Sequence, residues 1–274
     1  MNLSEKQIER YSRHIILPEV GGKGQEKLLA GRILIVGAGG LGSPSALYLA
    51  AAGVGTIGII DGDLVDLSNL QRQIAHSNAD LGKSKAISSA EAMQAINEDV
   101  NVRIYQERLT AENALTVIND YDFIIDGTDN FSSKFLISDA CHFAGKAYSH
   151  AGILRFEGQT ITVKPGETTC YRCIFGAPPP AGAAPSCSQA GVLGVLAGVI
   201  GTIQATEAIK YILGIGDLLT NRLLVYNALK MSFRLLEVRR NANCPLCGTN
   251  PSVTELIEGE QAVCDLNCDC TKTR

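Results

Sequence analysis

The feature that most constrains the fold is a glycine-rich turn between an apolar run and an alanine- and leucine-rich run. Residues 32–37, RILIVG, are typical of a short buried strand, and residues 41–52 have helical character. The turn between them is a G-x-G-x-x-G motif with one additional glycine, comprising Gly37, Gly39, Gly40 and Gly42. Glycines at a strand-to-helix turn let the backbone approach a phosphate group at the helix N-terminus. The motif therefore predicts a nucleotide-binding unit, and tight packing without a ligand is the alternative.

The alternation of strand and helix continues to about residue 150. Further strand-like runs occupy residues 56–61, 102–105, 121–126 and 147–150, and helical runs occupy residues 83–96 and 131–144. This order predicts an α/β fold with a Rossmann-like, doubly wound, mainly parallel sheet. Residues 158–163 alternate like a half-buried antiparallel strand, so we expect antiparallel strands to extend the sheet. The remaining expected elements are a loop, a long helix and two strands, at residues 177–185, 191–213, 223–226 and 233–239.

Composition narrows the class of protein. Hydrophobic residues make up 46% of the 274 residues and charged residues 19%, which is typical of a folded globular chain rather than a disordered one. The net charge of −4 provides no positive field for DNA or RNA, so we expect no nucleic-acid partner. The most apolar stretch, residues 192–203, is shorter than the ~20 residues that a membrane span needs, and the first residues lack a secretory signal. A cytoplasmic protein without membrane contact is the resulting expectation.

A carboxylate and a cationic segment follow the glycine motif. Asp61 ends the next strand-like run, where Rossmann folds place the carboxylate that binds ribose hydroxyls. This pair of features by itself indicates NAD and hydride transfer. Arg72 and Lys85 favour a different chemistry, because cations neutralise the charge that shifts between phosphates when a phosphoanhydride breaks. The alternative for these two residues is a solvated helix face.

Asp129 and Asn130 follow the strand-like run that ends at residue 126. Open α/β sheets bind ligands at the carboxyl ends of their strands, so a carboxylate here can hold the Mg²⁺ that accompanies ATP. Asp and Asn are also preferred helix N-caps, and a helix is expected to start near Phe131. Both roles are open for this pair of neighbours.

Four of the nine cysteines form two C-x-x-C pairs, Cys170 with Cys173 and Cys244 with Cys247. Two such pairs satisfy a closed tetrahedral zinc site, which would join distant segments of the chain. A redox C-x-x-C is the alternative, and it is disfavoured because two pairs are present and neither opens a thioredoxin-like helix. Cys187 lies on a Pro- and Gly-rich loop before a helix, so it is either a reactive nucleophile or an inert loop thiol.

These motifs, in this order, resemble the ubiquitin-activating-enzyme-like superfamily. The closer likeness is to the bacterial sulfur-carrier adenylyltransferases of the ThiF, MoeB and HesA group, and it runs from Leu3 to Gly248. The resemblance implies one adenylation domain at 1–248, in which a helical arm at 1–30 precedes a nucleotide-binding half at 31–150 and a carrier-binding and zinc half at 151–248. Residues 249–274, with three further cysteines, form a C-terminal extension outside the family pattern.

The resemblance implies ATP-dependent adenylation of the C-terminal glycine of a small ubiquitin-like sulfur-carrier protein that ends in Gly-Gly. The products are an acyl-adenylate and pyrophosphate, the metal is Mg²⁺, and the pathway is thiamine or molybdopterin cofactor biosynthesis. Carried over position by position, the ATP-binding residues are Gly40, Asp61, Ser68, Asn69, Leu70, Gln71, Arg72, Lys85, Asp129 and Asn130. Asp129 would hold the magnesium.

The resemblance also assigns roles beyond the nucleotide site. Arg13 would act on the phosphates bound by the partner subunit, which implies a homodimer, and the paired C-x-x-C cysteines would hold structural Zn²⁺. Cys187 matches a loop cysteine that in the thiamine branch forms a covalent link to the carrier. No rhodanese-like domain is expected in this chain, so the sulfur donor would be a separate protein. An NAD-dependent oxidoreductase and a non-catalytic nucleotide-binding scaffold remain the competing hypotheses.

Overall fold

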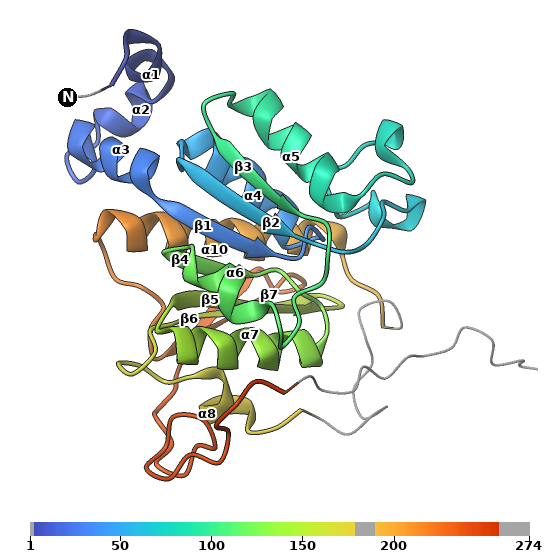
Figure 1. Cartoon of the computed structure of the whole chain (residues 1–274), viewed down its shortest axis with the longest axis vertical. Helices are drawn as coiled ribbons and strands as arrows, with labels where there is room; N and C mark the ends of the chain where they lie inside the picture. The colour runs from blue at the N-terminus through green and yellow to red at the C-terminus, as the bar shows by residue number, and fades with distance from the viewer. Residues whose placement is uncertain (1–2, 179–189, 258–274) are drawn as a thin grey trace, which may run out of the picture.

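One eight-stranded sheet organises the chain, with helices on both of its faces (Figure 1). The structure is a computed structural model that describes residues 3–178 and 190–257. The strand order is β3-β2-β1-β4-β5-β6-β7-β8. The strands are β1 (Arg32–Val36), β2 (Thr56–Ile60), β3 (Asn101–Tyr105), β4 (Phe123–Asp126), β5 (Ala147–Leu154), β6 (Glu157–Val163), β7 (Arg222–Asn227) and β8 (Ser232–Glu237).

The first five strands are parallel and form the doubly wound half that the sequence predicts. Strand β1 pairs with β2 on one side and with β4 on the other, and both pairings are parallel. The chain therefore adds β2 and β3 in one direction and β4 and β5 in the other. The strand order reverses between β1 and β4, and open α/β sheets bind ligands beside the carboxyl ends of the strands at such a point.

The last three strands extend the sheet by antiparallel pairing, also as predicted. The largest boundary difference is at β5, which runs to Leu154 rather than ending at His150. The extra residues of β5 pair with β6 from Ala151 opposite Thr160 to Leu154 opposite Glu157. A strand that continues into a hairpin gains backbone hydrogen bonds from its partner, which the short apolar run at residues 147–150 did not indicate.

The helices that the sequence predicts are present, with both ends as predicted for α7 and with shifted ends for the others. They are α4 (Gly42–Ala52), α5 (Lys85–Ile96), α7 (Phe131–Ala144) and α10 (Gly194–Leu213). An N-terminal arm holds α1 (Glu5–Arg10), α2 (Ser12–Ile15) and α3 (Gly21–Ala30). Two short helices, α6 (Ala114–Asn119) and α8 (Tyr171–Phe175), had no clear periodic signal in the sequence. Two single 3-10 turns are η1 (Leu67–Asn69) and η2 (Asn78–Asp80).

The two faces of the sheet carry separate cores. Ile33 and Ile35 of β1 pack with α3, α4, α5 and α10, whereas Leu34 and Val36 pack with α6 and α7. Because both faces are covered, a continuous apolar run forms this strand instead of an alternating one.

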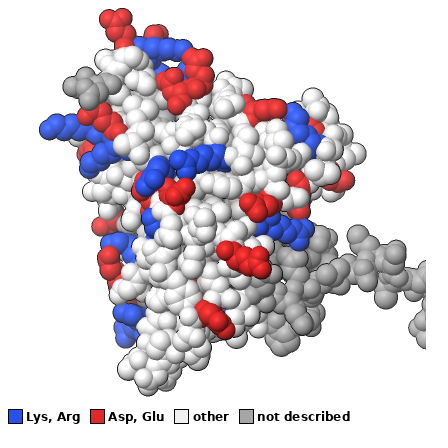
Figure 2. All heavy atoms as spheres, in the orientation of Figure 1, with Lys and Arg blue, Asp and Glu red and all other residues white. Residues whose placement is uncertain are grey.

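Within the described residues, no helix combines the length and the apolar character needed to cross a membrane. Acidic and basic side chains lie beside one another over the face drawn in Figure 2.

Candidate active site and metal centre

The glycine-rich turn joins β1 to α4 in five residues at the switch point of the sheet. Gly37 has a φ of 97°, a conformation that other residues rarely adopt, and its N–H donates to the Ile60 carbonyl at 2.9 Å. A Cβ atom on Gly42 would lie 1.9 Å from the Gly37 carbonyl oxygen, so only glycine fits there. The backbone thus turns tightly into the N-terminus of α4, where N–H groups suit an anionic ligand.

Asp61 lies directly after β2 and binds the backbone of this turn. One carboxylate oxygen accepts the Ala38 N–H at 2.8 Å, and the other accepts the Asp63 N–H at the same distance. Burial raises the pKa of the Asp61 carboxyl, and the two backbone hydrogen bonds and the nearby Lys85 oppose that rise. Each carboxylate oxygen has a second lone pair, so the group can brace the turn and still accept a ribose hydroxyl.

His76 contacts the carbonyl group of the same residue, Ala38, and sequence reasoning missed it. Its Nε2 lies 3.0 Å from the Ala38 carbonyl oxygen, and its Nδ1 lies 2.8 Å from Ser88 Oγ. A carbonyl only accepts, so Nε2 carries the proton and donates, and Nδ1 accepts from the hydroxyl. Burial lowers the pKa of the His76 ring, which favours this neutral form. A single histidine far along the chain from Ala38 gives no pattern that indicates the contact.

The segment from Ser68 to Gln73 folds back over the glycine turn. Asp66 starts η1 by accepting the Ser68 N–H at 2.8 Å, and Asn69 Oδ1 accepts the Asp66 N–H at 3.1 Å. Arg72 donates from Nη1 to the Ser68 carbonyl at 3.1 Å. Its Cγ lies 3.4 Å from the position that a Cβ on Gly40 would occupy, so the arginine stem lies against the turn. The structure therefore brings Arg72 to the turn, and the other predicted residues, Ser68, Asn69, Leu70 and Gln71, precede it in the same segment.

Lys85, the first residue of α5, reaches the same end of the sheet. Its Nζ lies 3.2 Å from Asp63 Oδ2, and Arg108 Nη2 lies 3.2 Å from Asp63 Oδ1. Burial would raise the pKa of Asp63, but the charge of Lys85, followed by that of Arg108, outweighs it and lowers that pKa. Asp63 was not among the residues that the sequence indicated. A bound phosphate would compete with this carboxylate for the ammonium group.

The segment after β4, which leads to Asp129, contacts the glycine turn through Gly127. The Gly127 N–H donates to the Val36 carbonyl at 2.9 Å, and a Cβ on Gly37 would lie 3.0 Å from the Gly127 carbonyl oxygen. Asn130 is the N-cap of α7, since its side chain accepts the Ser133 N–H at 2.8 Å. The structure therefore gives the capping role to Asn130, and the exposed Asp129 carboxylate is available for a cation.

Arg13 does not reach this site within one chain. It is an exposed residue of α2, and the neighbouring Tyr11 packs against Gly53, at the end of α4 opposite the glycine turn. The 11 residues of α4 separate the two ends by about 16 Å at 1.5 Å per residue. Figure 1 shows α1 and α2 at the upper left, where β1 begins rather than where it ends.

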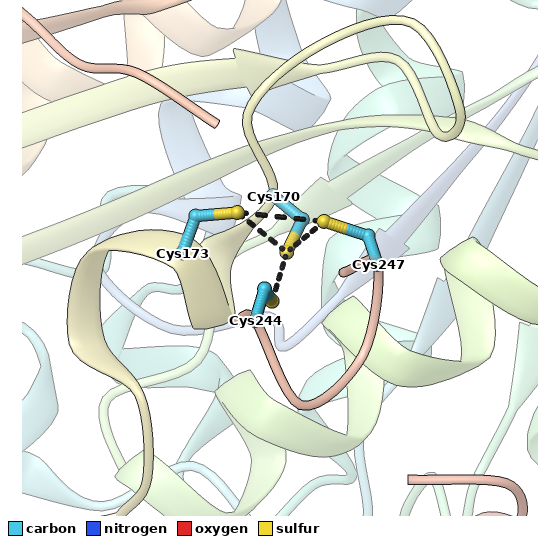
Figure 3. A group of neighbouring side chains, drawn as sticks. All are labelled: Cys170, Cys173, Cys244 and Cys247. Atoms are coloured by element: carbon cyan, nitrogen blue, oxygen red, sulfur yellow. Dashed lines mark hydrogen bonds between the residues drawn. The ribbon is translucent and has the colours of Figure 1, made fainter. Parts of the chain in front are cut away.

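Four cysteine sulfurs converge at one point below the sheet (Figure 3). They all lie within 4.8 Å of one another, and four of the Sγ–Sγ separations are between 3.4 and 3.6 Å. A tetrahedral zinc site with Zn–S bonds of ~2.3 Å needs separations of about 3.8 Å. None of the four forms a disulfide, so the donor set fits a structural zinc ion. The cluster consists of Cys170, Cys173, Cys244 and Cys247.

The cluster is built from a short helix and a turn. Cys170 is the N-cap of α8, so the first C-x-x-C does open a helix, although one of only five residues. The Asn241 N–H donates to Cys173 Sγ at 3.4 Å, as outer-shell groups do around metal-bound thiolates. Arg172 fastens the helix to α7 by two 2.7 Å bonds from Nε and Nη2 to the Asp139 carboxylate. Cys187 lies outside the described residues.

The comparisons agree with this geometry. A model of the ThiF family matches residues 11–246, which is most of the chain. The chain belongs to the ThiF family. It is 48% identical over 263 residues to a Mycobacterium tuberculosis protein named probable adenylyltransferase/sulfurtransferase MoeZ, covering 94% of this chain and 66% of the relative. It is 45% identical over 271 residues to the Thermus thermophilus sulfur carrier protein adenylyltransferase, covering 97% of this chain and 100% of the relative.

Further matches support the same fold and class. The Haloferax volcanii SAMP-activating enzyme E1 is 46% identical over 248 residues, with 90% of this chain and 92% of the relative covered. The crystal structure of E. coli MccB aligns with a TM-score of 0.76 at 21% identity, covering 94% of this chain and 76% of that one, which shows a shared fold. The chain spans only about two thirds of the MoeZ relative. The names of the relatives support the enzyme class expected from the sequence, a nucleotidyltransferase.

Proposed function

We propose that the protein adenylates the C-terminal glycine carboxylate of a small ubiquitin-like sulfur-carrier protein, with ATP as the nucleotide and pyrophosphate as the leaving group. One observation carries the proposal. The glycine turn, Asp61, Arg72, Lys85 and Asp129 meet at the switch point of one sheet, although they come from five separate segments. The relatives named as sulfur-carrier adenylyltransferases support the choice of substrate, in a thiamine or molybdopterin pathway.

The chemistry that this arrangement suits is attack of a carboxylate on the α-phosphorus of ATP. The carboxylate of a C-terminal glycine is already ionised near neutral pH, so no general base is needed. The bond between the α- and β-phosphates breaks as the acyl–phosphate bond forms, and pyrophosphate leaves with the electron pair. Such a reaction depends on positioning and on neutralising the phosphate charge.

Each residue then has a task that follows from its place. The backbone of the glycine turn cradles the phosphates, and Asp61 accepts ribose hydroxyls from the end of β2. Arg72 lies against the turn, and the Lys85 ammonium group would exchange its contact with Asp63 for one with a phosphate. Both cations would then offset the charge of the departing pyrophosphate. Exposed Asp129 supplies the carboxylate oxygen that Mg²⁺ prefers, and a bound Mg²⁺ would neutralise phosphate oxygens.

A homodimer completes the proposed site. The exposed Arg13 lies at the far end of α4 in its own chain, so it can act on phosphates only from a partner subunit. The paired cysteines would hold a structural zinc ion that joins α8 to the turn at residues 244–247. Cys187 and a separate sulfur-donor protein belong to the later sulfur-transfer step of the same proposal.

An apolar surface at the antiparallel end of the sheet supports a protein substrate. Phe156, Leu229, Met231, Phe233 and Leu235 are all large and exposed. The hairpins that carry them are adjacent, since the Ala228 N–H donates to the Phe156 carbonyl at 2.8 Å and the Tyr226 ring stacks on Phe233 at 4.5 Å. Exposed apolar clusters of this kind are typical of protein-binding surfaces. We assign this surface to the folded part of the carrier.

The deciding experiment is ATP–pyrophosphate exchange with Mg²⁺, without a carrier and with each Gly-Gly-ending carrier of the thiamine and molybdopterin pathways. Exchange with one carrier alone would support the reaction and identify the pathway. Silence with every carrier, together with measurable NAD binding, would favour an oxidoreductase. ATP binding without turnover would favour a non-catalytic scaffold.

A further inference from the structure

Lys134 is a buried cation that has no part in the proposed reaction. It lies in the first turn of α7, and its side chain is 7% exposed. Its Nζ donates to the Thr128 carbonyl at 2.7 Å and to the Ala151 carbonyl at 2.6 Å, and it lies 3.2 Å from Asp126 Oδ2. These three acceptors come from β4, from the segment that follows it and from β5. A buried ammonium group with three satisfied donors fixes the relative positions of the groups it binds.

The carboxylate beside Lys134 is also fully engaged. Asp126 Oδ1 accepts the Thr128 N–H at 3.1 Å and the Thr128 hydroxyl at 2.6 Å, and Oδ2 lies 2.9 Å from His150 Nδ1. Burial would raise the pKa of Asp126, but the charge of Lys134 and the hydrogen bond from His150 outweigh it and lower the pKa to about 2. Lys134 and Asp126 are therefore a charged pair inside the protein.

The segment held by this pair carries the exposed Asp129. Thr128 is bound through its N–H, its hydroxyl and its carbonyl, and Asn130 is bound as the N-cap of α7. Asp129 is the one residue between these two anchors. Its own carboxylate has no hydrogen bond or ion pair with any residue that the structure describes, so its position depends on the backbone on either side.

We propose that Lys134 is a positioning residue that holds the Thr128–Asn130 turn and so sets where the Asp129 carboxylate meets the nucleotide-bound magnesium. This inference rests on the proposed function, because it uses the magnesium role of Asp129. Outer-shell partners that orient a metal ligand commonly change metal affinity or activity by roughly 10- to 100-fold when they are removed. The competing explanation is that Lys134 only balances the buried Asp126 charge.

A pair of variants separates the two explanations. Lys134→Met removes the ammonium group and leaves the Asp126 carboxylate buried without its cation, so the variant is expected to lose stability. The double variant Lys134→Met with Asp126→Asn removes both charges, and the Asn oxygen can still accept from Thr128. It is expected to recover stability, but its Thr128 carbonyl still lacks the ammonium donor. Lys134→Arg retains a cation, and Lys146→Met, which removes a half-buried lysine bound to the Asn119 carbonyl, is the matched control.

The two readouts are the Mg²⁺ concentration that gives half-maximal ATP–pyrophosphate exchange and the hydrogen exchange of residues 127–133 in the free protein. We expect the double variant to need roughly 10- to 100-fold more Mg²⁺ than the wild type and to exchange these amides faster. Lys134→Arg is expected to keep a Mg²⁺ requirement and an amide protection close to those of the wild type. Lys146→Met is expected to change neither of them. A stable double variant with the wild-type Mg²⁺ requirement and wild-type amide protection would overturn the inference.

The same experiment keeps the two proposals apart. A wild-type protein that shows no exchange with any carrier contradicts the proposed function, and the magnesium part of the inference is then overturned with it. In that case the amide protection still reports whether Lys134 holds the turn. An active wild type combined with an unaffected double variant contradicts only the inference about Lys134.

Discussion

At the residue scale, two neighbours after β4 have separate tasks. Asn130 caps α7 with its side chain, whereas the carboxylate of Asp129 is exposed. From the sequence, either residue suited either role, because both types are good N-caps and both offer oxygen ligands. The hydrogen bond to the Ser133 N–H decides the matter in favour of Asn130 as the cap. The pair therefore offers a direct comparison between a functional and a structural substitution.

Asp129→Ala should abolish carrier-dependent ATP–pyrophosphate exchange and leave the fold nearly intact. The side chain is exposed and caps no helix, so the free energy of unfolding should change by no more than about 0.5 kcal/mol. Exchange kinetics and urea unfolding of the same preparation check both parts. A large loss of melting temperature with retained activity would contradict the magnesium assignment.

Asn130→Ala should have a larger effect on stability than the neighbouring substitution. Loss of the cap leaves the Ser133 N–H unsatisfied, so we expect the free energy of unfolding to fall by about 0.5–2 kcal/mol. Urea unfolding measures the change, and Asn130→Asp, which retains a capping oxygen, is the control. Equal stability of the Ala and Asp variants would show that the cap is unimportant.

His76 gives the site a pH-dependent support. Burial lowers its pKa in the folded protein, so the folded state disfavours the protonated ring. Its contribution to stability is present above the unfolded pKa of about 6.5 and is lost as the pH falls from there through the folded pKa. The difference in unfolding free energy between wild type and His76→Gln should therefore shrink between pH 7.5 and pH 5. A difference that is constant over this range would exclude a neutral, hydrogen-bonded ring.

At the scale of secondary-structure elements, the cysteine cluster joins two pieces that are too short to be stable alone. Helix α8 has five residues, and the turn at residues 244–247 follows the last strand of the sheet. Cys170 and Cys244 are 74 residues apart, and their sulfurs lie 3.5 Å from one another. A metal ion bound by both C-x-x-C pairs would hold these elements together in addition to the apolar contacts that they share.

Cys244→Ser should release the metal and destabilise the protein, because the loss of one thiolate opens the tetrahedral site. We expect about one zinc per chain in the wild type and almost none in the variant, with a lower melting temperature. Metal analysis and thermal unfolding are the measurements. Cys141→Ala is the control, since Cys141 is buried in α7 outside the cluster and its loss should leave the metal content unchanged. Unchanged zinc in the Cys244 variant would reject the ligand assignment.

At the scale of the whole molecule, the strand order decides which residues meet. The carboxyl ends of β1, β2 and β4 lie together because β1 is the centre of the parallel half. Segments after these three strands therefore supply the glycine turn, Asp61 and Asp129. The same architecture places Arg13 near the opposite end of α4. The site formed by one chain therefore lacks one of the residues that the family resemblance assigns to catalysis.

Mixing two inactive variants should restore activity if Arg13 acts across a dimer interface. Arg13→Ala and Asp129→Ala homodimers each lack one required group at both sites. A heterodimer has one complete site, because the chain with Asp129 intact receives Arg13 from its partner. After random subunit exchange we expect about a quarter of the wild-type activity from a symmetric dimer. Ultracentrifugation confirms the oligomeric state, and no recovery from verified heterodimers would reject the assignment across the interface.

Local patterns in the sequence were sufficient for the parallel half of the fold. The RILIVG run, the glycine turn and the helix that follows each depend on neighbouring residues, so the strand–turn–helix unit was predicted within a residue or two. Helix α7 was predicted with both ends correct. The candidate site residues came from motifs next to these elements, and the two C-x-x-C pairs were visible as spacings.

Only the tertiary structure decided which distant segments come into contact. The extension of β5, the short helices α6 and α8, the Asp63 pair with Lys85 and the contact of His76 with Ala38 all depend on partners far along the chain. The convergence of the four sulfurs and the Lys134–Asp126 pair also depend on the fold bringing separate segments together. The sequence by itself determined the backbone preferences and the apolar faces, because these act over a few residues. Burial, charge pairing and metal geometry depend on which elements the fold places side by side.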